Sequence, residues 1–155
     1  MDERLKLSDP DPAVRESAAE ALSYLGEDAA PAAVELLRAC DDTVESVQQW
    51  AVAALEGMGP PPAECIDDIL AVTQGQGSPS AYWAITLLGR CGESALRAET
   101  DLVKVLSDAS DDAIRERAAW ALGRIGASSN DAIAALNDAS ASGQPRLAQL
   151  AKTSL

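Results

Sequence analysis

The chain has 155 residues, enough for one ordinary domain, and its 25 acidic residues outnumber 12 basic ones, for a formal net charge of −13. This balance argues against binding to nucleic acid or to anionic membranes, because both need clustered Lys and Arg to meet phosphate groups. Histidine and phenylalanine are absent while alanine and leucine abound, which favours helices over strands.

The predicted elements are all helical and alternate between two kinds along the chain. Residues 2–8 form a short first helix, and residues 13–26 form a longer amphipathic one that follows the helix-capping sequence Asp9-Pro10-Asp11. Further amphipathic stretches cover residues 29–40, 46–59, 62–74, 79–92, 95–107, 113–126 and 129–139. A last helix over 147–155 stops one turn short of the pattern. The sequence thus predicts five helical hairpins, about ten helices in total.

The second helix of each hairpin carries the repeat. Four of them end at a glycine, and these glycines are 33, 33 and 34 residues apart: Gly26, Gly59, Gly92 and Gly126. Alanine stands eight positions before each glycine and leucine four positions before it: Ala18, Ala51, Ala84 and Ala118, and Leu22, Leu55, Leu88 and Leu122. Both positions fall on one stripe of a helix, so we expect them in the core, and we expect the glycines in the left-handed conformation that ends helices.

This pattern resembles the HEAT repeat. The residues that carry the resemblance are DPDPAVRESAAEALSYLG at 9–26 and DDAIRERAAWALGRIG at 111–126, which look most like the short bacterial phycobilisome-lyase HEAT-like repeat. The resemblance implies an all-α fold, an α-α superhelix or HEAT-like solenoid similar to armadillo proteins. It also predicts a single domain over residues 1–155, with repeats at about 1–26, 27–59, 60–92, 93–126 and 127–155.

Two further expectations follow from the family. HEAT repeats often carry an arginine near the start of the second helix that bonds the acidic turn of a neighbouring repeat. Arg15 and Arg115 match it, whereas Gln48 and Ala81 stand at its position in the middle repeats. The third repeat departs most, because Gly75-Gln76-Gly77-Ser78-Pro79 stands where the others have an acidic turn. We expect a longer or more mobile turn there.

All five aromatic residues lie on the second helices, which line the concave face in HEAT solenoids, and arginines share their positions. Tryptophan and tyrosine are favoured interface anchors, so this set predicts a binding groove that turns basic toward the C-terminal half. The candidate binding residues are Tyr24, Trp50, Tyr82, Trp83, Arg90, Arg117, Trp120 and Arg124. The alternative is that the tryptophans pack between successive helices and stabilise the stack.

No catalytic constellation is visible in the sequence. Without histidine, Ser-His and Cys-His nucleophile pairs and most zinc or iron sites are excluded. Cys40, Cys65 and Cys91 form no CxxC pair, which favours a reduced, intracellular setting, and the acidic neighbours of Cys65 should raise its pKa. The acidic runs at 41–45 and 64–68 are interpreted as helix caps and a solvated face rather than a calcium site, because no EF-hand spacing accompanies them.

The sequence therefore predicts a non-catalytic cytoplasmic scaffold with no cofactor and no metal. It is expected to be a monomer or weak oligomer that binds a protein or peptide, such as an acidic segment, in its concave groove. The alternative is an accessory subunit of a bilin lyase-like enzyme, which would bind a tetrapyrrole or its carrier protein. A HEAT-like DNA glycosylase is disfavoured by the net charge of −13.

Overall fold

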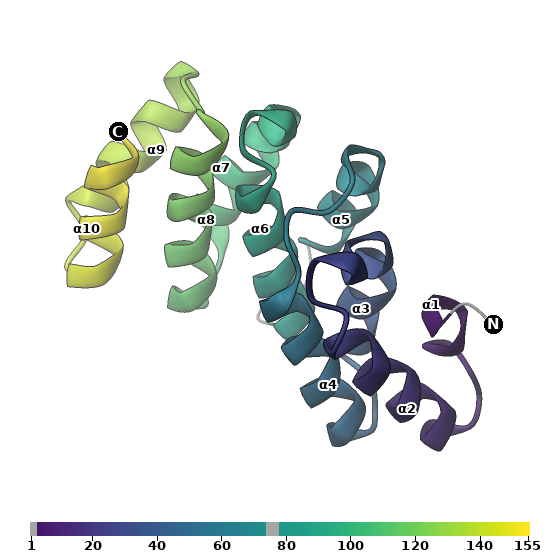
Figure 1. Ribbon diagram of the computed structural model, residues 1–155. Coiled ribbons are helices and arrows are strands. Elements are labelled where there is room, and N and C mark those ends of the chain that lie inside the picture. The colour runs from purple at the N-terminus through teal and green to yellow at the C-terminus, as the bar shows by residue number, and fades with distance from the viewer. Residues whose placement is uncertain (1–2, 74–77) are drawn as a thin grey trace. The chain divides into compact units, whose positions relative to one another are not determined.

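The computed structural model describes residues 3–73 and 78–155, and within them the secondary structure consists of ten α-helices and three 3-10 helices, without strands (Figure 1). The all-α prediction and the count of about ten helices are confirmed. The chain divides into two compact units, Met1–Ile69 and Leu70–Leu155. The glycine-rich part of the third turn, Gly75 to Gly77, lies outside the described residues. The partition into a single domain of five repeats stays a prediction.

The N-terminal unit holds the first two hairpins. Its elements are α1 (Glu3–Lys6), α2 (Pro12–Ser23), η1 (Gly26–Ala32), α3 (Ala33–Ala39), α4 (Glu45–Gly57) and η2 (Ala63–Cys65), followed by the start of α5 (Ile66–Val72). The longer helices α2 and α4 pack against each other, while α1 and α3 cover them from a second row. Asp11 caps α2 by accepting a hydrogen bond from the amide of Ala13 at 2.9 Å, and Pro12 occupies the first turn, where a missing N–H is harmless.

The C-terminal unit repeats this arrangement. Its elements are α6 (Pro79–Arg90), η3 (Gly92–Ala98), α7 (Glu99–Asp108), α8 (Asp112–Ile125), α9 (Asn130–Ser140) and α10 (Pro145–Ser154). The helices α6, α8 and α10 form one row in chain order, and α7 and α9 form the second (Figure 1). The side chains of Ser78, Asp111 and Ser129 cap the N-terminal ends of α6, α8 and α9.

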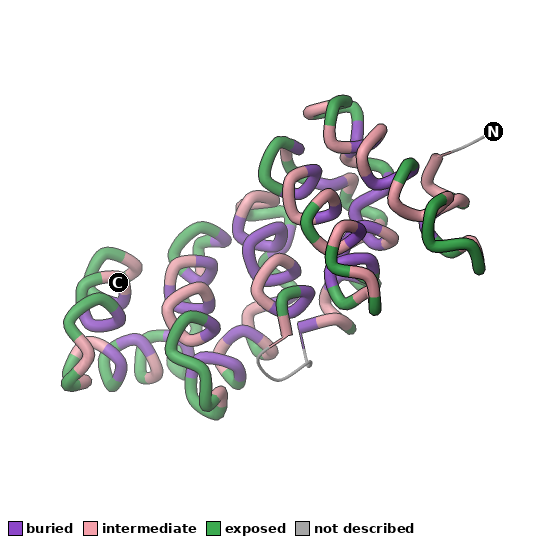
Figure 2. Tube along the Cα trace, turned by 90° about the horizontal axis from the view of Figure 1, so that it is seen from below, coloured by how far each residue is buried: buried purple, intermediate pink, exposed green. Residues whose placement is uncertain are grey.

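The core follows the predicted stripe. Every alanine eight positions before the closing glycine, and every leucine four before it, is buried, with Leu22 the most exposed of them at 4%. Along most helices buried positions recur between more exposed ones (Figure 2), as expected for helices that present one side to their neighbours. The last helix keeps the same register, because Leu147 and Ala151 are fully buried.

The glycine prediction is confirmed at three positions and wrong at the fourth. Gly26, Gly92 and Gly126 have φ of 55°, 57° and 75°. Gly59 is not left-handed, because α4 already ends at Gly57 and continues into an extended residue at Met58. Gly59 precedes Pro60, and the residue before a proline favours extended backbone, in keeping with the absence of a left-handed residue there.

The arginine expected to join neighbouring repeats does so in the first repeat. Arg15 binds Asp42 in the next turn through two parallel hydrogen bonds, Nε to Oδ2 at 2.7 Å and Nη2 to Oδ1 at 2.9 Å, and it also donates to the carbonyl of Asp9. This fork geometry lowers the pKa of Asp42, mainly through the hydrogen bonds from Arg15. Arg115 instead donates to the carbonyl of Leu106 and to Gln144, because the last turn has no acid to offer. Gln48 makes a bond of its own, to the carbonyl of Asp42.

Candidate binding surfaces

The structure brings seven of the eight predicted binding residues together in two clusters, one in each unit, and Arg124 lies outside both. In the N-terminal unit, the rings of Tyr24 and Trp50 are 6.0 Å apart and tilted by 50°. Tyr24 lies one residue beyond α2 and is 74% exposed, whereas Trp50, in the middle of α4, is half-buried. Leu25 is also exposed, at 48%, whereas Met58 and Ile125 at the same position of two other repeats are buried. Leu25 lies two residues beyond the last residue of α2.

In the C-terminal unit, one arginine organises the cluster. The guanidinium carbon of Arg117 lies 4.6 Å from the ring centre of Tyr82 and 5.2 Å from that of Trp120, and its Nη2 donates to the hydroxyl of Tyr82. Cations are attracted to the faces of such rings. Tyr82 meets Trp83 edge to face at 5.7 Å, and Arg90 lies over Trp83 at 5.8 Å. Stacking therefore links five of the eight candidate residues across α6 and α8.

Trp120 combines the two roles that the sequence left open. Its ring covers Gly89 of α6 so closely that a Cβ atom built on this glycine would lie 2.3 Å from Cζ3 of the tryptophan. Trp120 is nevertheless only half-buried, as are Trp50 and Trp83. Each tryptophan therefore packs against its neighbours with part of its ring and keeps the rest at the surface.

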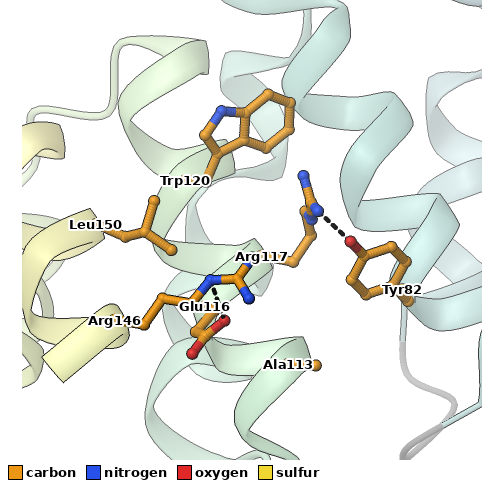
Figure 3. A pocket seen from close by; sticks show the side chains of 7 residues that line it. All are labelled: Tyr82, Ala113, Glu116, Arg117, Trp120, Arg146 and Leu150. Atoms are coloured by element: carbon orange, nitrogen blue, oxygen red, sulfur yellow. Dashed lines mark hydrogen bonds and ion pairs between the residues drawn. The ribbon is translucent and has the colours of Figure 1, made fainter. Parts of the chain in front are cut away.

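A hollow of about 140 Å³ opens beside this cluster (Figure 3). Its floor is one stripe of α8, from Ala113 at one end to Trp120 at the other, flanked by Tyr82 of α6 and by Leu150 of α10 (Figure 3). The remaining lining residues are Glu116, Arg117 and Arg146. Arg117 extends toward α6 and Arg146 lies on the α10 side, so the hollow has an arginine on both flanks (Figure 3).

Glu116 and Arg146 form an ion pair that the sequence did not predict. Nε of Arg146 lies 3.0 Å from Oε2 of Glu116, and 77% of the Arg146 side chain is exposed. Of the eight candidate residues, Tyr82, Arg117 and Trp120 line the hollow. Arg124 is exposed one helical turn beyond Trp120, on the same side of α8.

Charge is segregated between the two rows of helices in the C-terminal unit. The helices α6, α8 and α10 carry six basic residues and two acidic ones, a net charge of +4. The elements η3, α7 and α9 carry two basic and six acidic residues, a net charge of −4. The row of α6, α8 and α10 is therefore net positive within a chain whose net charge is −13.

Cys40 and Cys65 are weak nucleophiles in this fold. Burial raises the pKa of Cys40 to about 12. The pKa of Cys65 is also raised, first by burial and then by Glu64, Glu35 and Asp68, in the direction that its acidic neighbours predicted. Within residues 3–73 and 78–155, no three His, Cys, Asp or Glu side chains are arranged to hold a metal ion. Nor does any helix of this part of the chain combine the length and apolar character needed to cross a membrane.

The family of HEAT repeats matches residues 4–63 and 66–155, and the chain belongs to this family. Among curated proteins, none matches the chain. The solved structures similar to it include a designed armadillo repeat protein in complex with the peptide (KR)4, with a TM-score of 0.67 and 18% identity over 98% of this chain and 78% of that one. They also include the complex of CpcE and CpcF of phycocyanin lyase from Nostoc sp. PCC7120, with a TM-score of 0.62 and 18% identity over 98% of this chain and 95% of that one. At such identities the likeness establishes the fold alone.

Proposed function

We propose that this chain is a non-catalytic scaffold that binds an acidic protein segment on the surface formed by α6, α8 and α10. The observation that carries the proposal is the hollow beside Arg117, which places apolar side chains between two arginines. A partner could insert an apolar side chain between Trp120 and Leu150 while its carboxylates meet the guanidinium groups. Half-exposed aromatic and arginine side chains are the residue types that dominate binding energy at protein interfaces.

Two features of Arg117 suit it for this role. The flanking rings of Tyr82 and Trp120 hold the guanidinium in place, so little side-chain entropy remains to be lost when a carboxylate binds. A guanidinium also has more N–H donors than the one that Arg117 gives to Tyr82, and its planar edge matches a carboxylate in a paired geometry. Arg146 is more exposed and already forms an ion pair with Glu116, so we expect it to contribute less to the binding of the acidic segment.

Peptide titration tests this function. The probe is a fluorescein-labelled peptide rich in Asp and Glu with a central leucine, and the readout is fluorescence anisotropy at physiological salt. The variant Arg117→Gln should weaken binding about tenfold, the loss of roughly 1.4 kcal/mol expected for a charged contact at an interface. The matched control is Lys104→Gln, which removes the same charge from an exposed position on α7 and should leave the affinity unchanged.

A peptide in which lysine replaces every acid separates specific from unspecific binding. The proposal fails if Arg117→Gln weakens binding of this basic peptide as much as it weakens binding of the acidic one, or if Lys104→Gln weakens binding of the acidic peptide as much as Arg117→Gln does. The bilin lyase alternative rests on likeness in fold, and a spectral titration with a free bilin tests it separately. A saturable shift of the bilin absorbance that Arg117→Gln abolishes would favour the tetrapyrrole over the peptide.

A further inference from the structure

The N-terminal unit carries an exposed apolar patch of its own, formed by Tyr24, Leu25 and Trp50. Tyr24 and Leu25 are 74% and 48% exposed, and the half-buried ring of Trp50 lies beside that of Tyr24. At the position of Leu25 in two other repeats, Met58 and Ile125 are buried, at 3% and 0%. Adjoining large apolar side chains held at the surface are typical of an interaction site.

The charge around this patch is opposite to that of the α6, α8 and α10 surface. The N-terminal unit has four basic residues and 16 acidic ones, a net charge of −12, whereas the C-terminal unit has eight and nine, a net charge of −1. Three of the four basic side chains of the N-terminal unit lie in ion pairs with acids of that same unit, namely Arg4 with Glu35, Lys6 with Glu3, and Arg15 with Asp42. Nearly all of the protein's excess negative charge therefore belongs to the unit that carries the patch.

Acidic residues adjoin the apolar patch on both sides along the chain. Glu20 lies one helical turn before Tyr24 on the same side of α2, and Glu27 and Asp28 begin η1 directly after Leu25. Glu27 and Asp28 are exposed, and the left-handed Gly26 makes the sharp change of direction between Leu25 and these two acids. Three carboxylates therefore stand within four residues of Tyr24 or Leu25 along the chain, and those of Glu27 and Asp28 are exposed.

We propose that Tyr24, Leu25 and Trp50, with the neighbouring Glu20, Glu27 and Asp28, form a docking surface for a basic segment of a partner protein. An apolar side chain of that segment packs on Tyr24 and Leu25, and flanking Lys or Arg side chains pair with the carboxylates and with the faces of the two rings. Charge complementarity selects this occupant, because an acidic segment would meet a unit with a net charge of −12. The surface is separate from the one proposed on the C-terminal unit and requires a partner of opposite charge.

The chain supplies its own reporter for this site. Trp50 is the one tryptophan of the N-terminal unit, so in the variant Trp83→Phe/Trp120→Phe the indole emission comes from Trp50 alone. This variant is titrated with a Lys-rich and Arg-rich peptide that has a central leucine, at low and at physiological salt. We expect a saturable change in Trp50 emission and an affinity that falls by about tenfold between the two salt concentrations, because exposed charges are screened.

Two sets of substitutions decide whether the binding is local. The double variants Tyr24→Ala/Leu25→Ala and Glu27→Gln/Asp28→Asn should each lower the affinity for the peptide by about tenfold. Because these four side chains are exposed, the variants should keep the circular dichroism spectrum of the parent. The matched control Glu64→Gln/Asp68→Asn removes two exposed charges from the same unit and should change the affinity by less than about twofold.

Three results would overturn the proposal. In the first, Trp50 emission stays constant over the titration. In the second, the control pair weakens binding as much as Glu27→Gln/Asp28→Asn, which means that general attraction to an acidic protein is sufficient. In the third, Tyr24→Ala/Leu25→Ala abolishes a self-association seen by sedimentation without affecting the peptide, so that a second copy of the chain is the occupant. Should the double tryptophan variant fail to fold, the Nε1–H signal of Trp50 in the wild-type chain gives the same answer by NMR.

Discussion

Gly89 lies in α6 directly beneath the ring of Trp120, so the smallest substitution at this position tests how tightly the two helices pack. An added Cβ would lie 2.3 Å from Cζ3 and 2.9 Å from Cη2 of Trp120, well inside van der Waals contact. The better helix propensity of alanine should raise the free energy of unfolding of Gly89→Ala by up to about 1 kcal/mol. The clash should lower the free energy of unfolding by about 1–3 kcal/mol, because the ring of Trp120 has to move away from α6.

The control Gly57→Ala separates the two contributions. Gly57 is also helical, the last residue of α4, and its added Cβ would meet no atom within 4 Å. We expect Gly57→Ala to be neutral or stabilising and Gly89→Ala to be the less stable of the two by about 1–3 kcal/mol in urea denaturation. Emission of Trp120 in the variant Trp50→Phe/Trp83→Phe should shift to the red with Gly89→Ala, because the displaced ring becomes more exposed. The packing described for Trp120 is refuted if both alanine variants are equally stable and the emission does not move.

Three further predictions concern the core and its charges. Because the folded pKa of Asp42 is lower than its unfolded value, its pairing with Arg15 stabilises the fold above the ordinary Asp pKa of about 4 and is lost as the pH falls through the folded pKa. The melting temperature of Asp42→Asn should therefore lie below that of the wild type near neutral pH and approach it near pH ~2; equal melting temperatures at neutral pH would contradict this. Cys40, whose pKa is raised to about 12, should resist a thiol reagent at pH ~8 in the variant Cys65→Ser/Cys91→Ser until urea unfolds the chain, and rapid labelling of the native protein would show that its burial is wrong. Leu88→Ala should cost about 2–5 kcal/mol of unfolding free energy, whereas Leu25→Ala at the exposed patch should stay within about 0.5 kcal/mol, and similar costs would contradict the assignment of the two positions.

The fold could be predicted from the sequence because its signal repeats. One alanine or leucine at a helical spacing is weak evidence, but Ala18 and Leu22 recur at the same offsets in three more copies, and all eight side chains are buried. The family resemblance also predicted a long-range bond from Arg15 to the turn of a neighbouring repeat. In the structure the acceptor of this bond is Asp42. That partner lies 27 residues away and has no local signal of its own.

The binding surfaces were only partly predictable. The aromatic and arginine positions could be read from the repeat, but no pattern in the sequence pairs Glu116 of α8 with Arg146 of α10. The room that Gly89 leaves for Trp120 depends on how closely α6 and α8 approach, and no local rule fixes that distance. Leu25 is exposed beyond the last residue of α2, and helix ends are the least regular part of such a repeat.

The indole Nε1–H signals test the account most directly, because the three tryptophans report separately on its two surfaces. They are assigned by single Trp→Phe variants and followed in the wild-type chain during titration with the acidic peptide and, in a second sample, with the basic one. The account predicts that the acidic peptide shifts the signal of Trp120 and leaves Trp50 in place, whereas the basic peptide shifts Trp50 and leaves Trp120 in place. Signals that stay unmoved with the acidic peptide, or a shift of Trp50 alone with that peptide, would contradict the binding function proposed for the surface formed by α6, α8 and α10.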